Sequence, residues 1–164
     1  MDWSVALPNI WFLLITVLFT GFFVLEGYDF GVGVLAQLLG KDDIEKRVYF
    51  NTIGPFWDAN EVWLLTGGGA MFAAFPIWYG KLFSGYYIAF VLMLVALILR
   101  GVSFEFRGKL GDNRKWIKAC DFAMFIGSLL PPVLWGVAVA NFMTGANLDQ
   151  GKNLVDGFLG LLSP

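Results

Sequence analysis

Acidic side chains interrupt the long apolar stretches of this chain, and they limit what it can fold into more than any other feature. The clearest case is the segment 55–65, where Asp58 and Glu61 alternate with Trp57, Asn60 and Trp63 at the head of an apolar run. A charge near the bilayer centre costs about 2.5–3.5 kcal/mol, so such groups usually face a bundle interior or a water path. The pattern therefore predicts a membrane protein that handles ions or protons, or one that builds a polar site within lipid.

The composition also favours a membrane protein. The 164 residues are 58% hydrophobic and 15% charged, whereas soluble domains contain about 25% charged residues. Four stretches approach the length of about 20 apolar residues that a spanning helix needs. We expect an all-α, multi-spanning transmembrane four-helix bundle in contact with membrane lipid. It would form one domain over residues 1–164, with helices at about 8–39, 51–79, 82–104 and 116–143. The N-terminus lacks the basic region of a signal peptide, so the first stretch is expected to be a permanent span.

Charge and residue usage exclude several kinds of site. A net charge of −2 gives no indication of a nucleic-acid partner. Cys120 is the single cysteine, so the sequence has neither an internal disulfide nor a thiolate cluster. The chain also contains no histidine. It therefore cannot ligate haem through imidazole, and we expect it to bind no metal.

The basic residues predict how the chain is oriented in the membrane. They gather in the first and third connections between the apolar stretches, and by the positive-inside rule these connections are cytoplasmic. Both ends of the chain then lie outside. In this orientation, charged groups from all four helices fall in the cytoplasmic leaflet. They are Glu26, Asp29, Asp58, Glu61, Arg100, Glu105 and Asp121. This asymmetry predicts a polar inlet that opens to the cytoplasm.

The pair Glu26 and Asp29 allows more than one interpretation, and so does Asp58. Glu26 and Asp29 are three residues apart, on one helix face, but they could be interfacial if the helix leaves the membrane near residue 28. Asp58 could lie in the first turn of a helix that begins at Pro55, where the macrodipole favours a carboxylate. It lies deeper if that helix begins near residue 42 and is kinked at Pro55.

Arg100 and the two tryptophans also have simpler alternatives. Arg100 ends a run of apolar residues, and it either snorkels to the inner headgroups or pairs with Asp58 or Glu61. Trp57 and Trp63 alternate with the carboxylates, so they either line a polar path or pack in the core.

Several motifs then resemble a known family. They are Glu26-Gly27-Tyr28-Asp29-Phe30-Gly31-Val32-Gly33, Trp57-Asp58-Ala59-Asn60-Glu61-Val62-Trp63-Leu64, Phe72-Ala73-Ala74-Phe75-Pro76, Arg100-Gly101-Val102-Ser103-Phe104-Glu105-Phe106-Arg107, Gly127-Ser128 and Pro131-Pro132. In this order, they closely resemble subunit II of the cytochrome bd-type quinol oxidases of bacteria and archaea. Members of that family are usually considerably longer, so the chain matches the N-terminal half.

The resemblance implies a role in a terminal oxidase of the cytoplasmic membrane that oxidises quinol and reduces dioxygen to water. It implies that haem b, haem d and the quinol site belong to a partner, subunit I, and that this chain ligates no cofactor. The remaining half of subunit II would be a further partner if the subunit is split or truncated. In the family, the aspartate that corresponds to Asp58 is placed on a cytoplasmic proton route, and Arg100 and Glu105 also match the family pattern.

The resulting hypothesis is a subunit that shapes a proton route and stabilises the haem subunit. Asp58 would relay protons, Arg100 and Glu105 would tune or feed it, and Glu61, Glu26 and Asp29 would assist. Trp57, Asn60 and Trp63 would form the wall of the route or the contact with the partner. The alternatives are one half of a proton-coupled secondary transporter, with a midplane site reachable from both sides, and a purely structural scaffold.

Overall fold

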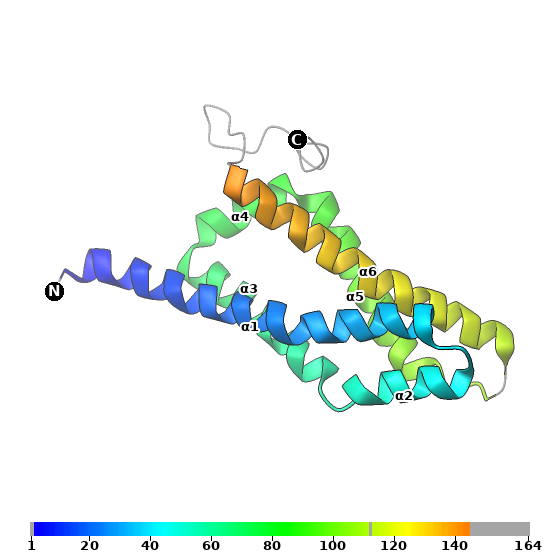
Figure 1. Ribbon diagram of the computed structural model, residues 1–164. Coiled ribbons are helices and arrows are strands. Elements are labelled where there is room, and N and C mark those ends of the chain that lie inside the picture. Colours follow the sequence, from blue (N-terminus) through cyan, green and yellow to red (C-terminus); the bar gives the residue numbers. More distant parts are fainter. Residues whose placement is uncertain (1, 112, 145–164) are drawn as a thin grey trace.

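The computed structural model describes residues 2–111 and 113–144, and all regular structure within them is helical (Figure 1). The helices are α1 (Trp3–Leu39), α2 (Asp43–Ile53), α3 (Trp57–Ala74), α4 (Pro76–Gly85), α5 (Tyr87–Phe106) and α6 (Arg114–Thr144). Helices α1, α5 and α6 are each long and apolar enough to cross a membrane, and α3 with α4 forms a bent pair that could make a fourth span. The expected all-α, multi-spanning class is confirmed.

The prediction of a single helix over 51–79 is wrong, because the helix is broken near both ends of that range. The chain turns at Gly54-Pro55-Phe56, so that α2 is a separate helix and α3 begins only at Trp57. Pro55 has no backbone N–H to continue the hydrogen-bond ladder of α2. Asp58 consequently lies in the first turn of α3.

The second break lies at Phe75, and it turns α4 by 119° from α3. Phe75 has φ −135° and ψ 61°, outside the helical region, because a residue before a proline is sterically disfavoured there. Pro76 then begins α4, the position at which proline is best tolerated in a helix. A further break at Tyr86 makes α5 begin at Tyr87, later than the expected residue 82.

The helices pack around α1 and α6. Helix α6 lies along α5 and crosses α1, while α3 and α2 pack on α1. In Figure 1, the N-terminal end of α1 (blue) projects beyond the other helices, and α6 runs from beside the C-terminal part of α1 (its yellow end) to α4 (its orange end). One apolar cluster joins Ile15 of α1 to α3, α4 and α5, and a second joins Ala36 of α1 to α2 and α6. The segment of α1 between these two clusters contains Glu26 and Asp29.

Two glycines allow helices to approach closely beside that segment. A Cβ atom built on Gly127 of α6 would lie 2.6 Å from the Ala96 carbonyl oxygen and 2.7 Å from Arg100 Cβ, both on α5. A Cβ atom on Gly33 of α1 would lie 2.0 Å from the Ser128 hydroxyl oxygen of α6. Small residues of this kind permit tight helix packing in membranes. Helix α6 therefore presses directly against both α1 and α5 at this level.

The contact at Gly127 gives a prediction for stability. Gly127→Ala should lower the free energy of unfolding by about 1–3 kcal/mol, because the added methyl group meets backbone atoms that cannot move aside. Gly136→Ala on the same helix should leave it unchanged or raise it slightly, because nothing lies within 4 Å of that position and alanine favours helix. Thermal unfolding of the detergent-purified protein measures both. Equal effects of the two substitutions would contradict the close contact.

Candidate functional site: a buried arginine with three acidic partners

The centre of the site is Arg100, a guanidinium buried inside the bundle. Only 1% of its side chain is exposed, and it projects from the C-terminal half of α5. Its Nη1 donates to Glu26 of α1 and lies 3.5 Å from Glu61 Oε1 of α3. Its Nη2 lies 4.0 Å from Asp29 Oδ2 of α1. One arginine therefore faces three carboxylates from two other helices.

The surrounding groups fix this arrangement. Asn60 Nδ2 of α3 donates to Asp29 Oδ2 at 2.8 Å. The Arg100 guanidinium also lies over the Phe30 ring of α1, 4.7 Å from its centroid, a distance at which a cation is attracted to an aromatic face. Phe30 is one residue after Asp29, so the same turn of α1 supplies an acidic and an aromatic partner. Helices α1, α3 and α5 are joined through this one side chain.

The structure decides between the alternatives for Glu26, Asp29 and Arg100. Glu26 is fully buried and Asp29 is 3% exposed, so neither is a merely interfacial group in the described fold. Arg100 does not simply snorkel, because its guanidinium is enclosed by carboxylates. Of the two partners considered from sequence, Glu61 makes the contact. Glu26, which was not considered, is the closer partner.

Asp58 and Glu105 lie outside this cluster. Asp58 is exposed in the first turn of α3, and its Oδ1 accepts from the Ala59 N–H at 2.8 Å. Glu105 is exposed on α5. A step of five residues turns a helix by about 140° beyond one full turn, so Glu105 points away from the face that presents Arg100. In the part of the chain that the structure describes, neither carboxylate forms an ion pair with Arg100.

The two tryptophans pack against neighbouring helices. The Trp57 ring lies 5.3 Å from the Phe104 ring of α5 and covers Gly101, one residue beyond Arg100. The Trp63 ring lies against Gly21 of α1 and is 36% exposed. Trp57 therefore lies beside Arg100, Trp63 packs further along α1, and neither contacts the charged atoms of the cluster in any described interaction.

Arg100, Glu26, Asp29 and Glu61 form what we call the Arg100 cluster. An open groove of about 410 Å³ reaches this cluster at Asp29. Its walls are mostly apolar, and its polar lining includes Asp29 and Asn60, the hydrogen-bonded pair beside Arg100. Residues of α1, of α2 and of the turn before α3 form the walls. They are Leu25, Tyr28, Val32, Thr52, Ile53 and Phe56. The Arg100 cluster is therefore closed on the side of α6 and approached from the side of α2.

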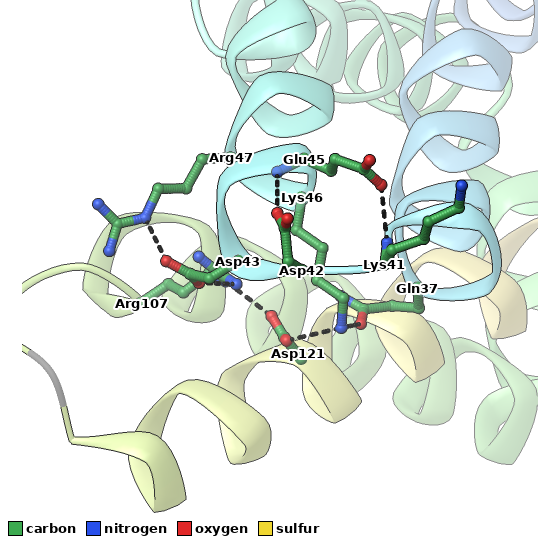
Figure 2. Close-up of polar contacts among 9 residues, drawn as sticks. All are labelled: Gln37, Lys41, Asp42, Asp43, Glu45, Lys46, Arg47, Arg107 and Asp121. Carbon is green, nitrogen blue, oxygen red and sulfur yellow. Dashed lines mark hydrogen bonds and ion pairs between the residues drawn. The ribbon is translucent and has the colours of Figure 1, made fainter.

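A second charged cluster, which the sequence did not reveal, holds α2 in place (Figure 2). Arg107 Nε donates to Asp121 Oδ1 of α6 at 2.6 Å, and its Nη2 donates to Asp43 Oδ1 of α2 at 2.7 Å. Lys46 of α2 donates to Asp121 Oδ2 at 3.0 Å and to Gln37 Oε1 of α1 at 2.7 Å. The basic residues of the first and third connections, which include Lys46 and Arg107, served in the sequence analysis only to orient the chain in the membrane. The available signal was that Arg107 and Asp121 border the same short connection.

The electrostatics of this second cluster keep Arg107 charged. Burial would lower the pKa of the Arg107 guanidinium, but hydrogen bonds and charges from Asp121 and Asp43 raise this pKa above its ordinary value. Arg107 therefore stays protonated at any physiological pH. It serves as a fixed cation that ties α2 to the end of α5 and to α6.

The described residues include no group of three or more histidine, cysteine, aspartate or glutamate side chains arranged to hold a metal ion. With no histidine in the sequence, the Arg100 cluster has only oxygen and guanidinium groups to offer. Its carboxylates can accept hydrogen bonds, and each can in principle take up a proton.

Comparison with known proteins identifies the family. Residues 7–164 match the model of the family described as cytochrome bd terminal oxidase subunit II. The chain belongs to this family. The resemblance found in the sequence motifs is thereby confirmed, and a secondary transporter is no longer a competing interpretation.

Curated relatives agree with this assignment. The chain is 56% identical to the cytochrome bd ubiquinol oxidase subunit 2 of Bacillus subtilis over 149 residues, which are 91% of this chain and 44% of that protein. It is 45% identical to the cytochrome bd-I ubiquinol oxidase subunit 2 of Escherichia coli K12 over 168 aligned residues, covering 100% of this chain and 44% of that protein. A probable cytochrome oxidase subunit 2 of Haemophilus influenzae is 49% identical over 136 residues. The chain spans less than half the length of these relatives.

The second cluster predicts a strong contrast between two charged side chains. Asp121→Asn should lower the free energy of unfolding by up to about 3–5 kcal/mol, because it leaves the largely buried Arg107 and Lys46 with one fewer counter-charge. Arg47→Ala should cost less than about 1 kcal/mol, because the Arg47–Asp43 pair is 53% and 39% exposed. Denaturant or thermal unfolding of the purified protein compares them. A mild effect of Asp121→Asn would contradict the bridging role of Asp121.

Proposed function

We propose that this chain is the N-terminal portion of subunit II of a bd-type quinol oxidase in a bacterial or archaeal cytoplasmic membrane. Family membership supports this proposal, as do relatives whose names describe ubiquinol oxidase subunits. In the complex, quinol is the electron donor and dioxygen is reduced to water. Haem b and haem d reside in the partner subunit I, and the rest of subunit II completes the assembly.

In this proposal, the chain contributes a proton route from the cytoplasmic side, since the reduction of dioxygen to water consumes protons. The observation that carries the proposal is a series of acidic groups of decreasing exposure. Asp58 is exposed, the Glu61 side chain is 27% exposed, and Glu26 is fully buried beside Arg100. Asp58 and Glu61 are three residues apart on α3, so they are neighbours on one helix face. The series leads from the surface of the chain to the interior.

The charge balance of the cluster suits proton transfer. Three carboxylates share one guanidinium, and an excess of negative charge is costly where the dielectric constant is low. A proton on one carboxyl group reduces this excess. When that proton moves on, the positive charge of Arg100 stabilises the carboxylate that remains. Asn60 holds Asp29 in position by its hydrogen bond.

The remaining candidate residues have supporting roles in this proposal. Trp57 and Trp63 border the cluster and limit water beside it, or meet the haem subunit. Glu105, which is exposed on α5, would gather protons at the surface and would not belong to the buried relay. Exposed apolar side chains on α1, α3 and α5 provide surface for lipid and for the haem subunit, so that the chain also stabilises that subunit.

Removing one buried acid tests the proton route. Glu26→Gln should reduce quinol-dependent oxygen consumption by roughly 100-fold, the lower end of what a proton-transferring group contributes, with the haem spectra unchanged. Asp58→Asn should have a smaller effect, because an exposed inlet can be bypassed by water. Glu45→Gln is the matched control, because the exposed Glu45 side chain accepts from the Lys41 N–H just before α2 and lies away from Arg100.

Normal turnover of Glu26→Gln with intact haem spectra would leave this chain as a scaffold. Loss of the haem spectra would instead show that Glu26 is required for assembly. In that case, Asp29→Asn and Glu61→Gln provide the same test of the route.

The proposal includes an orientation with the N-terminus outside and the Arg107 cluster at the cytoplasmic face. In a Cys120→Ala background, Ser4→Cys should react with a membrane-impermeant maleimide in intact cells. Lys109→Cys should react only after the membrane is opened. The reverse labelling pattern would place the Arg100 cluster near the outer face of the membrane and remove its access to cytoplasmic protons.

A further inference from the structure

Ser128 of α6 is a fully buried hydroxyl that the relay described above does not use. Its relative exposure is 0%, and its Oγ makes no hydrogen bond with any of the residues that the structure describes. A buried polar group without a partner is destabilising, and nearly all such groups in native proteins are satisfied by protein or ordered water. A helical serine commonly bonds the carbonyl four residues earlier, but Ser128 does not bond that of Met124.

Contacts on both sides place Ser128 beside the Arg100 cluster. Its Oγ occupies the space next to Gly33 of α1, where an added Cβ atom would lie 2.0 Å away. Gly33 is four residues, about one helical turn, beyond Asp29. The preceding residue, Gly127, touches the backbone of Arg100, since an added Cβ atom would lie 2.9 Å from the Arg100 nitrogen. Ser128 therefore packs against α1 one turn beyond Asp29, and its neighbour Gly127 packs against α5 at Arg100.

Two atoms of the Arg100 cluster are, like Ser128 Oγ, buried without a described hydrogen-bond partner. Arg100 Nη2 and Glu26 Oε2 are buried and make no hydrogen bond among the described residues. Arg100 Nη2 can only donate and Glu26 Oε2 lacks a donor, whereas a serine hydroxyl both donates and accepts. A buried water needs two to four polar partners. A water shared by such groups would satisfy a donor and an acceptor together.

We propose that the Ser128 hydroxyl, Arg100 Nη2 and Glu26 Oε2 bind an ordered water, and that a proton passes between the Glu26 carboxyl group and this water, which extends the proton route to α6. The inference rests on the proposed function, because it adds a member to the same relay. Ser128 is then a positioning residue that holds the water next to Arg100. Helix α6 is part of the site through this hydroxyl as well as through the packing of Gly127.

Because Gly33 and Ser128 are in contact, the effect of the hydroxyl group can be tested separately from the effect of packing. A side chain on residue 33 would fill the space that Ser128 fills now, so the two residues can be exchanged. The double variant Gly33→Ser with Ser128→Gly returns a hydroxyl to this space from α1. The double variant Gly33→Ala with Ser128→Gly fills the space without a hydroxyl and is the matched control. Ser84→Ala, at an exposed serine of α4, controls for the substitution itself.

The experiment measures quinol-dependent oxygen consumption by the assembled oxidase against pH, with haem spectra recorded for every variant. Ser128→Ala and the Gly33→Ala double variant should slow turnover by about three- to tenfold, the rate equivalent of one neutral hydrogen bond. The loss should grow with rising pH, where protons are scarce. The Gly33→Ser double variant should recover much of the rate. A high-resolution map of the complex should show a water at hydrogen-bond distance from Ser128 Oγ, and Ser128→Ala should remove it.

Wild-type turnover and pH profile in Ser128→Ala would overturn the inference, as would a wild-type rate in the Gly33→Ala double variant. Glu26→Gln serves as the reference. If Glu26→Gln slows turnover and Ser128→Ala does not, the water site fails and the proton route stands. If neither variant slows turnover, the proposed function itself fails.

Discussion

The packing of α1, α3 and α5 depends on one buried cation, Arg100. Arg100 would be very costly to bury alone, and it is tolerated because α1 and α3 bring carboxylates to it. The pairing works in both directions, since Glu26 and Asp29 need a cation as much as Arg100 needs anions. Any arrangement of α1, α3 and α5 that separated these groups would leave unpaired charge in an apolar interior. The same contacts that align the helices therefore also gather the acids at one level.

The rest of the fold keeps this cluster closed on one side and approachable on the other. Gly127 and Gly33 let α6 lie directly against α5 and α1, which leaves little room for bulk water on that side. On the opposite side, α2 forms part of the groove that reaches Asp29. The ion pairs of Arg107 and Lys46 with α6 hold α2 there. The position of this short polar helix is thus set by charge as well as by the burial of Phe50 and Ile53.

Much of this organisation could be predicted from the sequence. Apolar length predicted an all-α membrane fold, and the spacing of charges predicted that acids of several helices would converge. Spacing along one helix cannot show which residues of another helix it meets, so Glu26 was ranked below Asp58 although it is the principal partner of Arg100. The break at Phe75 was readable from Pro76, but local sequence does not fix the 119° angle between α3 and α4. The orientation of the protein and its route for protons remain predictions.

The central claim is that Arg100 and Glu26 stabilise each other inside the bundle, and a double-mutant cycle tests it most directly. The free energy of unfolding would be compared for the wild type, Arg100→Met, Glu26→Gln and the double variant, in the assembled oxidase. We expect strong non-additivity, with a coupling of at least about 1 kcal/mol. Arg100→Met should destabilise the wild type far more than it destabilises the Glu26→Gln background. Additive effects would contradict the account, because they would mean that the two side chains do not depend on one another.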